Sequence, residues 1–380
     1  MDFELTDEQR DIQRMARQFV AKEIIPITRE LDEKEEHSPE IINKLFDVGL
    51  MNFPIPVEYG GPGLDTLTTM LVTEELNYGC AGIATTVAAN SLATYPILIA
   101  GTPEQKEKFL SFMCEEPRLA AFGLTEPSVG SDAAGLSTTA VREGDYYRLN
   151  GSKCFITNGG VADLYTIFAT VDRSKGIKGI TAFIVPASTP GTSGGKKEHK
   201  MGLRCSNTTD VILEDVMVPV ENRLGDEGEG FKMAMKTLNK ARINVGASAT
   251  GVARAAMDAA TSYSKQRIQF GKSISEFQGI QFILADMAIQ IEAARMLVWQ
   301  AAFLEDRGIP SIKEAAIAKT FASDMAMKVT TDAVQVFGGY GFTREFLVEK
   351  YMRDVKIMQI YDGTNQIQRM IIARQLLQNS

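Results

Sequence analysis

The sequence predicts a helical domain over residues 1–118, an antiparallel β-barrel domain over residues 119–229, and a second helical domain with four-helix-bundle packing over residues 230–380. Three observations predict this fold class. Apolar residues recur at helical spacing up to about residue 118, short β-like runs separated by glycine follow, and long helical periods return from Gly230. Strands without intervening helices indicate a small barrel, here set between two helical domains.

Composition limits the class of protein. The 380 residues are 44% hydrophobic and 23% charged, as in globular proteins of two or three domains. The net charge of -8 gives no electrostatic reason to expect nucleic-acid binding. No stretch approaches about 18 uninterrupted apolar residues, so we expect no membrane span. A start without a basic and apolar leader, together with four scattered cysteines, predicts a soluble, cytoplasmic protein without disulfides. Neither of the two histidines has a second ligand at metal spacing, so no metal site is expected.

The N-terminal region reads as helices separated by proline and glycine. A helix is expected to begin at Thr6, and the Pro54–Gly63 stretch reads as a loop. The segments 64–78 and 81–99 are mostly apolar, which predicts buried helices, the second kinked at Pro96. Another helix restarts after Thr102.

Turn residues divide the predicted β-domain. Glu143-Gly144-Asp145 and Asn150-Gly151 both read as hairpin turns, and residues 186–197 read as an exposed loop. The predicted strands cover residues 120–124, 138–141, 146–150, 164–170, 180–185 and 210–218.

The last third predicts long helices over residues 231–266, 280–307 and 312–337, then a closing pair around Asp362. Asp362 and Gly363 fall where one apolar helical pattern stops and the next begins, so they are expected on a turn. A carboxylate there can face a cavity. The alternative is structural: Asp362 caps the next helix and Gly363 relieves strain.

Two segments of the β-domain are candidates for binding a flat cofactor. Leu124 to Asp132 packs hydroxyls, carboxylates and glycine into a loop, but matches neither a dinucleotide fingerprint nor a P-loop and could be a solvated turn. Phe155-Ile156-Thr157 ends a strand with an aromatic ring and a hydroxyl, as a heteroaromatic cofactor requires. Alternatively, Phe155 is a core residue.

Arginine and glycine recur in the C-terminal region. Arg267, close to Gly271, and the pair Gly338-Gly339 are suited to a pyrophosphate, because a guanidinium pairs with phosphate oxygens and glycine lets backbone N–H groups approach. Gly338-Gly339 also reads as a helix C-cap.

Taken in order, these segments resemble the acyl-CoA dehydrogenases from end to end. The blocks that carry the resemblance are Thr125-Glu-Pro-Ser-Val-Gly-Ser-Asp132, Phe155-Ile-Thr157-Asn-Gly, Met201-Gly-Leu-Arg204, Arg267-x-x-Phe270-Gly-Lys272, Gln335-x-x-Gly338-Gly339 and Tyr361-Asp-Gly-Thr-Asn-Gln366. The resemblance implies helical, β-barrel and helical domains, FAD where they meet, and a homotetramer in which a neighbouring subunit completes the flavin site.

The resemblance also assigns roles to residues. Those expected to bind FAD are Leu124, Thr125, Ser131, Phe155, Ile156, Thr157, Arg267, Phe270, Gln278, Gln335, Gly338, Gly339, Thr364 and Gln366. Those expected to bind the acyl-CoA substrate are Ser131, Asn239, Arg242, Tyr361 and Gly363. Asp362 takes the position of the catalytic base, which removes the α-proton while the β-hydride passes to flavin N5. Electron-transferring flavoprotein is the implied acceptor, as in β-oxidation.

One residue departs from the family pattern. Short- and medium-chain members carry glutamate where this chain has Asp362, and one methylene withdraws the carboxylate by about 1.5 Å. The other helix position used for a base in this family is Ala241, which leaves Asp362 as the candidate. A shorter acid leaves room for an alicyclic or branched acyl group such as cyclohexane-1-carboxyl-CoA. A short straight-chain, butyryl-type substrate is the alternative, as is the same fold acting as an enoyl-CoA reductase.

Overall fold

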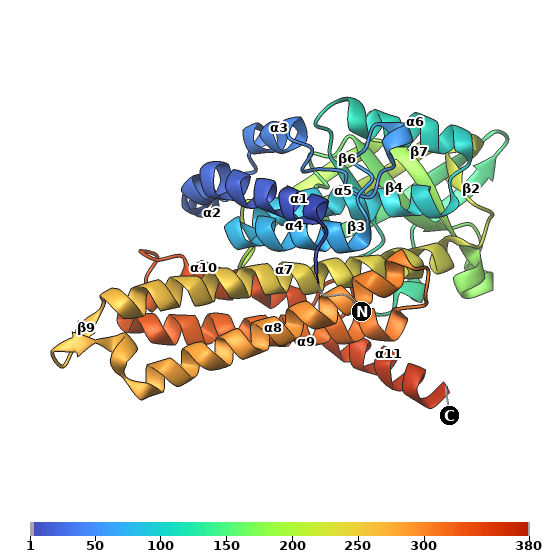
Figure 1. Cartoon of the computed structure of the whole chain (residues 1–380). Coiled ribbons are helices and arrows are strands. Elements are labelled where there is room, and N and C mark those ends of the chain that lie inside the picture. The colour runs from blue at the N-terminus through green and yellow to red at the C-terminus, as the bar shows by residue number, and fades with distance from the viewer. Residues whose placement is uncertain (1–3, 379–380) are drawn as a thin grey trace.

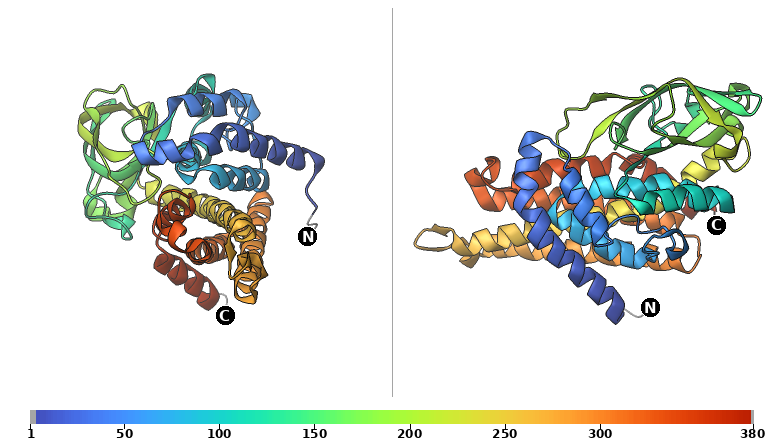
Figure 2. Two further views of the ribbon diagram at one scale, coloured as in Figure 1. Left: turned by 90° about the vertical axis from the view of Figure 1, so that its left-hand side faces the viewer. Right: turned by 90° about the horizontal axis from the view of Figure 1, so that it is seen from above.

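The computed structural model describes residues 4–378 and arranges the chain in three groups of elements. N-terminal helices and a β-sheet domain lie side by side, and the C-terminal helices run along both (Figure 1). Viewed along the bundle, the three groups meet around a common centre (Figure 2). The helical, β and helical order predicted from the sequence is confirmed.

Within residues 4–118, six α-helices form the N-terminal group. Two of them begin with the expected capping boxes, in which Thr6 pairs with Gln9 and Thr102 pairs with Gln105. These helices are α1 (Asp7–Phe19), α2 (Thr28–Lys34), α3 (Pro39–Asp47), α4 (Thr66–Gly79), α5 (Ala81–Ala100) and α6 (Pro103–Glu115). Helix α5 runs through Pro96 and is largely buried, because it packs against α4, α6, α7 and the sheet.

The β-domain holds one eight-stranded sheet in the order β6-β7-β3-β2-β4-β5-β8, with β1 paired to β4. Its strands are β1 (Ala120–Gly123), β2 (Thr139–Glu143), β3 (Tyr146–Thr157), β4 (Leu164–Thr170), β5 (Ile180–Pro186), β6 (Thr192–Lys197), β7 (Thr208–Pro219) and β8 (Arg223–Leu224). The turn at Gly144, where φ is 61°, joins β2 to β3 as predicted.

Three details of the predicted sheet are wrong. Strand β3 continues through Asn150-Gly151, where the pairing with β7 shifts register, so this dipeptide forms a bulge and not a hairpin. Residues 192–197, expected in a loop, pair with β7 as strand β6. The sheet is also mixed, because β1 and β2 each pair with β4 in parallel.

Long helices make up the C-terminal group. They are α7 (Gly230–Gln266), α8 (Gln278–Asp306), α9 (Ile312–Phe337), α10 (Val348–Val355) and α11 (Asn365–Gln378), with a small hairpin of β9 (Ile268–Gln269) and β10 (Lys272–Ser273) between α7 and α8. Alanine and valine fill the core between α7, α8 and α9, which lets these helices approach closely.

Helix α5 is long and apolar enough to cross a membrane by length and composition, and it is the one such helix within residues 4–378. Its most apolar stretch is 61% buried inside the protein. That burial is typical of the core helix of a globular domain.

Candidate active site

Asp362 lies on the predicted turn, between a 3₁₀ turn (Lys356–Gln359) and α11. Both Asp362 and Gly363 adopt left-handed backbone conformations, with φ of 52° and 88°. Thr364 caps α11, since its hydroxyl accepts a hydrogen bond from the backbone N–H of Ile367 at 3.3 Å. The structural alternative, in which Asp362 is the cap, is therefore wrong.

Three side chains from three helices hold the backbone of this turn. Gln368 of α11 donates to the carbonyl oxygens of Asp362 and Gly363, at 3.2 and 2.9 Å. Lys319 of α9 donates to Gly363 O at 2.9 Å, and Arg242 of α7 approaches Asp362 O at 3.4 Å. The turn is thus held in place by the hydrogen bonds that its two carbonyl oxygens accept.

The electrostatic surroundings of Asp362 are mixed. Burial raises the pKa of its carboxyl above the ordinary value, while the nearby charges of Lys319 and Arg242 oppose that rise. Burial lowers the pKa of Lys319 to about 8, although the charge of Asp362 acts in the other direction. The result is an acid with raised proton affinity, flanked by two buried cations, as a base working near neutral pH requires.

Helix α5 joins the Asp362 turn to the sheet. Asn158, directly after β3, donates to Thr86 O of α5 at 3.0 Å and to Ala120 O at 3.1 Å. The neighbouring Thr85 lies close enough to the hydroxyl of Tyr361 to oppose the rise in pKa that burial causes there. The end of β3 and the residue before Asp362 therefore meet on the same helix.

Phe155 is exposed, not part of the core, so the alternative reading of this residue is wrong. It sits in a second bulge of β3, between the pairs Lys153–Val211 and Ile156–Thr209, with φ of 56°. Its side chain is 67% exposed beside the buried Ile156. Thr157 is partly exposed, and its hydroxyl has no partner in the part of the chain that the structure describes. An exposed ring, an apolar neighbour and a free hydroxyl fit the edge and face of an isoalloxazine.

A buried ion pair ties the 124–138 loop to this bulge. Lys153 Nζ lies 2.6 Å from Glu126, and both side chains are inaccessible to solvent. Glu126 also accepts hydrogen bonds from the backbone and hydroxyls of Ser137 and Thr138. Cys154 N donates to Thr125 O at 2.9 Å, so Thr125 and the buried Leu124 lie beside the Phe155 segment. Ser131 is exposed further along the loop.

The other FAD-binding candidates lie elsewhere, on the β9–β10 hairpin and the adjoining ends of α8 and α9. Arg267 stands over the ring of Tyr340 at 5.7 Å, which places the hairpin next to the Gly338-Gly339 segment. Gly338 ends α9 with φ of 61°, so it is also the expected C-cap. All six residues are exposed: Arg267, Phe270, Gln278, Gln335, Gly338 and Gly339. Figures 1 and 2 place this hairpin at the far end of the bundle from the β-domain. One chain does not bring the two sets together.

One substrate-binding candidate on α7, Arg242, contacts Asp362, and the other, Asn239, precedes it by three residues on the same helix. Arg242 is 6% exposed, and among the described residues its guanidinium pairs with no carboxylate and makes one hydrogen bond, to Asp362 O. Asn239 has a buried side-chain oxygen without a partner. Unused polar groups beside the turn are suited to a polar ligand. Tyr361, Gly363 and Thr364 belong to the turn itself, and Gln366 is exposed on α11.

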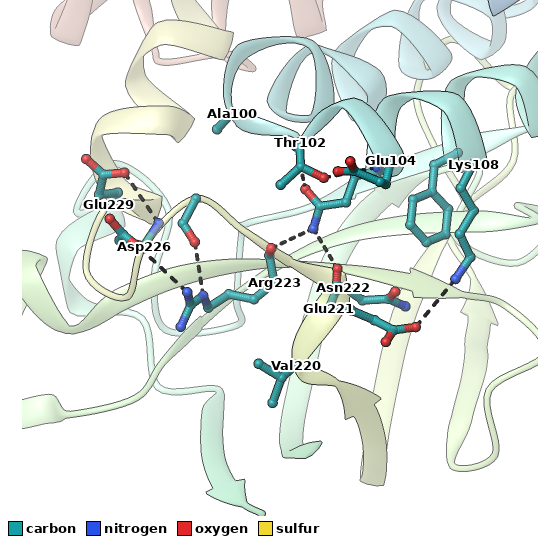
Figure 3. Close-up of a pocket in the computed structure, with 13 residues that line it drawn as sticks. Ala100, Thr102, Glu104, Lys108, Val220, Glu221, Asn222, Arg223, Asp226 and Glu229 are labelled. Carbon is teal, nitrogen blue, oxygen red and sulfur yellow. Dashed lines mark hydrogen bonds and ion pairs between the residues drawn. The ribbon is translucent and has the colours of Figure 1, made fainter. Parts of the chain in front are cut away.

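A pocket of about 640 Å³ lies away from this turn. It lies between α6 and the segment from Val220 to Glu229, with Lys108, Glu221 and Arg223 among its lining residues (Figure 3). Its charges largely pair with one another, and Gln105 is occupied by Glu221 O and Arg223 O. We place no chemistry there.

The fold and site define a class of proteins, the acyl-CoA dehydrogenases. The family descriptions "Acyl-CoA dehydrogenase, N-terminal domain", "middle domain" and "C-terminal domain" match residues 6–117, 121–216 and 228–377. The chain belongs to this family and is an acyl-CoA dehydrogenase whose cofactor is FAD, as the resemblance implied.

Individual relatives cover the whole chain. The short-chain specific acyl-CoA dehydrogenase of Megasphaera elsdenii is 51% identical over 382 residues, covering 99% of this chain and 100% of the relative. That of Clostridium acetobutylicum is 47% identical, covering 98% and 99%. Among solved structures, butyryl-CoA dehydrogenase from Megasphaera elsdenii has a TM-score of 0.97 at 51% identity, covering 99% of this chain and 100% of that one. A chain in the structure of the electron transferring flavoprotein of Acidaminococcus fermentans has a TM-score of 0.97 at 52% identity, with the same coverage.

Sequence reasoning missed the supports of the site. Lys319, Gln368 and the Glu126–Lys153 pair were not singled out, although each contacts a residue that was. A lysine within an alanine-rich helical stretch and a glutamine near the chain end carry no local signal. A lysine at an inward-facing position of β3 is the one clue that the strand pattern offered.

Proposed function

We propose that this enzyme oxidises a short, straight-chain acyl-CoA of the butyryl type, with Asp362 as the base that removes the α-proton. The observation that carries the assignment of the base is the Asp362 turn: a carboxyl of raised pKa, on a backbone held from three helices, joined through α5 to the exposed Phe155 segment. A placed base of raised proton affinity suits the weakly acidic C–H next to a thioester.

The choice of substrate follows the relatives. The room left by the shorter acid suggested an alicyclic acyl group, but full-length relatives at 51% and 47% identity are short-chain specific, and a solved relative is a butyryl-CoA dehydrogenase. These findings support the straight-chain alternative over cyclohexane-1-carboxyl-CoA. The relatives carry the dehydrogenase name, which also favours oxidation over enoyl-CoA reduction.

The residues of this chain then divide the work of proton removal. Asp362 accepts the α-proton. Its backbone N–H, which has no acceptor among residues 4–378, is suited to donate to the thioester oxygen as negative charge develops there. Arg242 and Asn239 would hold polar groups of the CoA part, because both keep unused polar atoms beside the turn. Tyr361, packed against Thr85, would form part of the cavity wall.

FAD, when bound, supplies the acceptor for the β-hydride. Its isoalloxazine ring would be held by Leu124, Thr125, Phe155, Ile156 and Thr157. Further contacts to FAD would come from Ser131, Thr364 and Gln366. The exposed residues around the β9–β10 hairpin, from Arg267 to Gly339, would hold the adenine dinucleotide part of a cofactor bound mainly by another subunit. The separation of the two sets within one chain supports this sharing.

We propose that the enzyme forms a homotetramer. We also propose that electron-transferring flavoprotein binds to it and accepts the electrons from the reduced flavin. The C-terminal helices and hairpin expose large apolar side chains, including Phe270 at 93%, Phe282 at 60% and Ile289 at 66%, and surfaces of this kind mark protein interfaces. The relative of known structure described with the electron transferring flavoprotein of Acidaminococcus fermentans supports the acceptor. We also propose that the domains meet at residues 118 and 229.

The proposal is tested with purified, FAD-loaded enzyme under anaerobic conditions. Butyryl-CoA is expected to bleach the flavin absorption faster than cyclohexanecarboxyl-CoA, and the Asp362→Asn variant is expected to keep FAD while losing nearly all flavin reduction. Faster flavin reduction by cyclohexanecarboxyl-CoA would contradict the assignment of a short straight-chain substrate. Undiminished flavin reduction in the Asp362→Asn variant would contradict the assignment of Asp362 as the base.

A further inference from the structure

We propose that Lys319 is a positioning residue for Asp362: its ammonium group fixes the turn that aims the carboxylate and places a buried positive charge beside it. The inference deepens the proposed function, because it rests on Asp362 acting as the base. It concerns a residue on a different helix, 43 positions earlier in the chain.

The backbone decides where this carboxylate lies. Aspartate has a single methylene between Cα and the carboxyl group, so with the backbone fixed the χ1 rotation alone sets the position of the carboxyl carbon, and χ2 turns its two oxygens. Asp362 has φ of 52°, a left-handed conformation that is unfavourable for a residue with a Cβ, and Gly363 follows at 88°. Such a pair of conformations persists where surrounding contacts hold it, and in this turn those contacts are made to the two carbonyl groups.

Lys319 joins both sides of the turn. Its Nζ lies 2.9 Å from Gly363 O and 2.8 Å from Asn365 Oδ1, at the first residue of α11. Asn365 is itself fixed, because its amide nitrogen donates to Ser323 Oγ at 2.9 Å and to Asp324 Oδ1 at 2.7 Å. One ammonium group therefore ties the residue after Asp362 and the start of α11 to the N-terminal third of α9.

A purely structural role does not account for a charge in this place. Lys319 is fully buried, and burial lowers its pKa to about 8, which means that keeping it protonated is unfavourable. Its Nζ makes no ion pair with a carboxylate among the described residues. The charges that act on it are those of Asp362, Arg242 and Asp324. Of these, Asp362 gains most from a cation, because burial raises its own pKa.

The test compares variants that remove the charge with one that removes a similar charge elsewhere. Lys319→Met removes charge and hydrogen bonds, whereas Lys319→Gln keeps an amide donor. Lys350→Met is the matched control, since Lys350 is equally buried but pairs with Asp354 on α10. Two properties are measured on FAD-loaded enzyme: the pH dependence of flavin reduction by butyryl-CoA, and the infrared C=O band of protonated Asp362, identified as the band absent from Asp362→Asn.

Removing a cation beside an acid raises the pKa of that acid. Both Lys319 variants are therefore expected to move the acid limb of the rate profile and the titration of the C=O band to higher pH. Lys319→Met is also expected to lower the limiting rate by about tenfold to a hundredfold, with a smaller change in KM, because the carboxylate is misplaced. Lys350→Met is expected to leave both midpoints where they are in the wild type.

Each outcome decides the question. Wild-type midpoints in FAD-loaded Lys319→Gln would overturn the proposal, as would shifts equally large in Lys350→Met. If neither Lys319 variant folds with FAD bound, Lys319 is a structural residue and the proposal is overturned. If Asp362→Asn reduces flavin normally, the proposed function itself fails. If Asp362→Asn is inactive while the Lys319 variants titrate normally, the inference about Lys319 alone fails.

Discussion

Replacing Lys153 by methionine tests how the loop from Leu124 to Thr138 is held. Lys153 and Glu126 form an ion pair of 2.6 Å that is inaccessible to solvent, and methionine has similar length without the charge. The loss leaves a buried carboxylate without its cation, which costs about 3–5 kcal/mol in comparable sites. Because Thr125 and Leu124 adjoin Glu126, the variant is expected to be less stable and also to lose FAD more readily.

The pKa shifts of Glu126 and Lys153 give opposite indications of how much their ion pair contributes to the stability of the folded state. The pKa of Glu126 falls from 4.5 to about 2, although burial opposes this, because Lys153, Ser137 and Thr138 stabilise the carboxylate. The pKa of Lys153 falls from 10.5 to about 8 because burial of the ammonium outweighs the attraction of Glu126. Each change corresponds to about 3 kcal/mol, with opposite effects on stability. Glu126 has additional hydrogen bonds and Lys153 has few, which explains the difference. We therefore expect the pair as a whole to contribute little relative to neutral partners.

A double-mutant cycle separates these statements. Lys153→Met is expected to be strongly destabilised, whereas Lys153→Met combined with Glu126→Gln is expected to recover most of the loss, because no buried charge remains. Urea unfolding of the FAD-loaded enzyme gives the free energies. The contribution of Glu126 is present above pH 4.5 and is lost as the pH falls towards 2. A Lys153→Met variant as stable as the wild type would refute the reasoning, as would a double variant no better than the single one.

Three further predictions follow from individual positions. Burial raises the folded-state pKa of Asp362 above 3.8, so stability falls as the pH rises through the folded pKa; Asp362→Asn, which cannot ionise, is expected to melt above the wild type at neutral pH, with the difference vanishing towards pH 3.8. A Cβ at Gly202 would lie 2.5 Å from the backbone oxygen of Arg353, so Gly202→Ala is expected to cost about 1–3 kcal/mol in urea unfolding, whereas Gly279→Ala, with open space around it, is expected to be nearly neutral. Phe155→Ala is expected to weaken FAD binding in equilibrium dialysis with little change in apoprotein stability, because the ring is 67% exposed; an unchanged FAD affinity would contradict its placement against the flavin.

Much of the fold could be predicted from periodicity and turn residues. The helix boundaries near Gly230, Phe337 and Asp362 follow from apolar spacing and glycine, which are local signals. The error at Asn150-Gly151 arose because the same dipeptide serves a hairpin turn and a bulge within a continuous strand. The pairing of β3 with β7, more than 50 residues later in sequence, decided between them.

The candidate site could be predicted only where the chemistry lies in contiguous residues. The Tyr361 to Gln366 segment carries its own acid, glycine and cap, so it could be found by inspection. Lys319 could not, because the contact between its Nζ and Gly363 O joins residues 44 positions apart on different elements. The exposure of Phe155 likewise depends on a bulge that local sequence does not indicate.

The central claim is that Asp362 is the base, and a crystal structure of the FAD-loaded enzyme with a butyryl-CoA analogue that cannot be oxidised tests it most directly. The account predicts a carboxylate oxygen of Asp362 about 3–3.5 Å from the substrate α-carbon, with the thioester between that oxygen and the flavin. A carboxylate turned to solvent, or one separated from the α-carbon by another side chain, would contradict it.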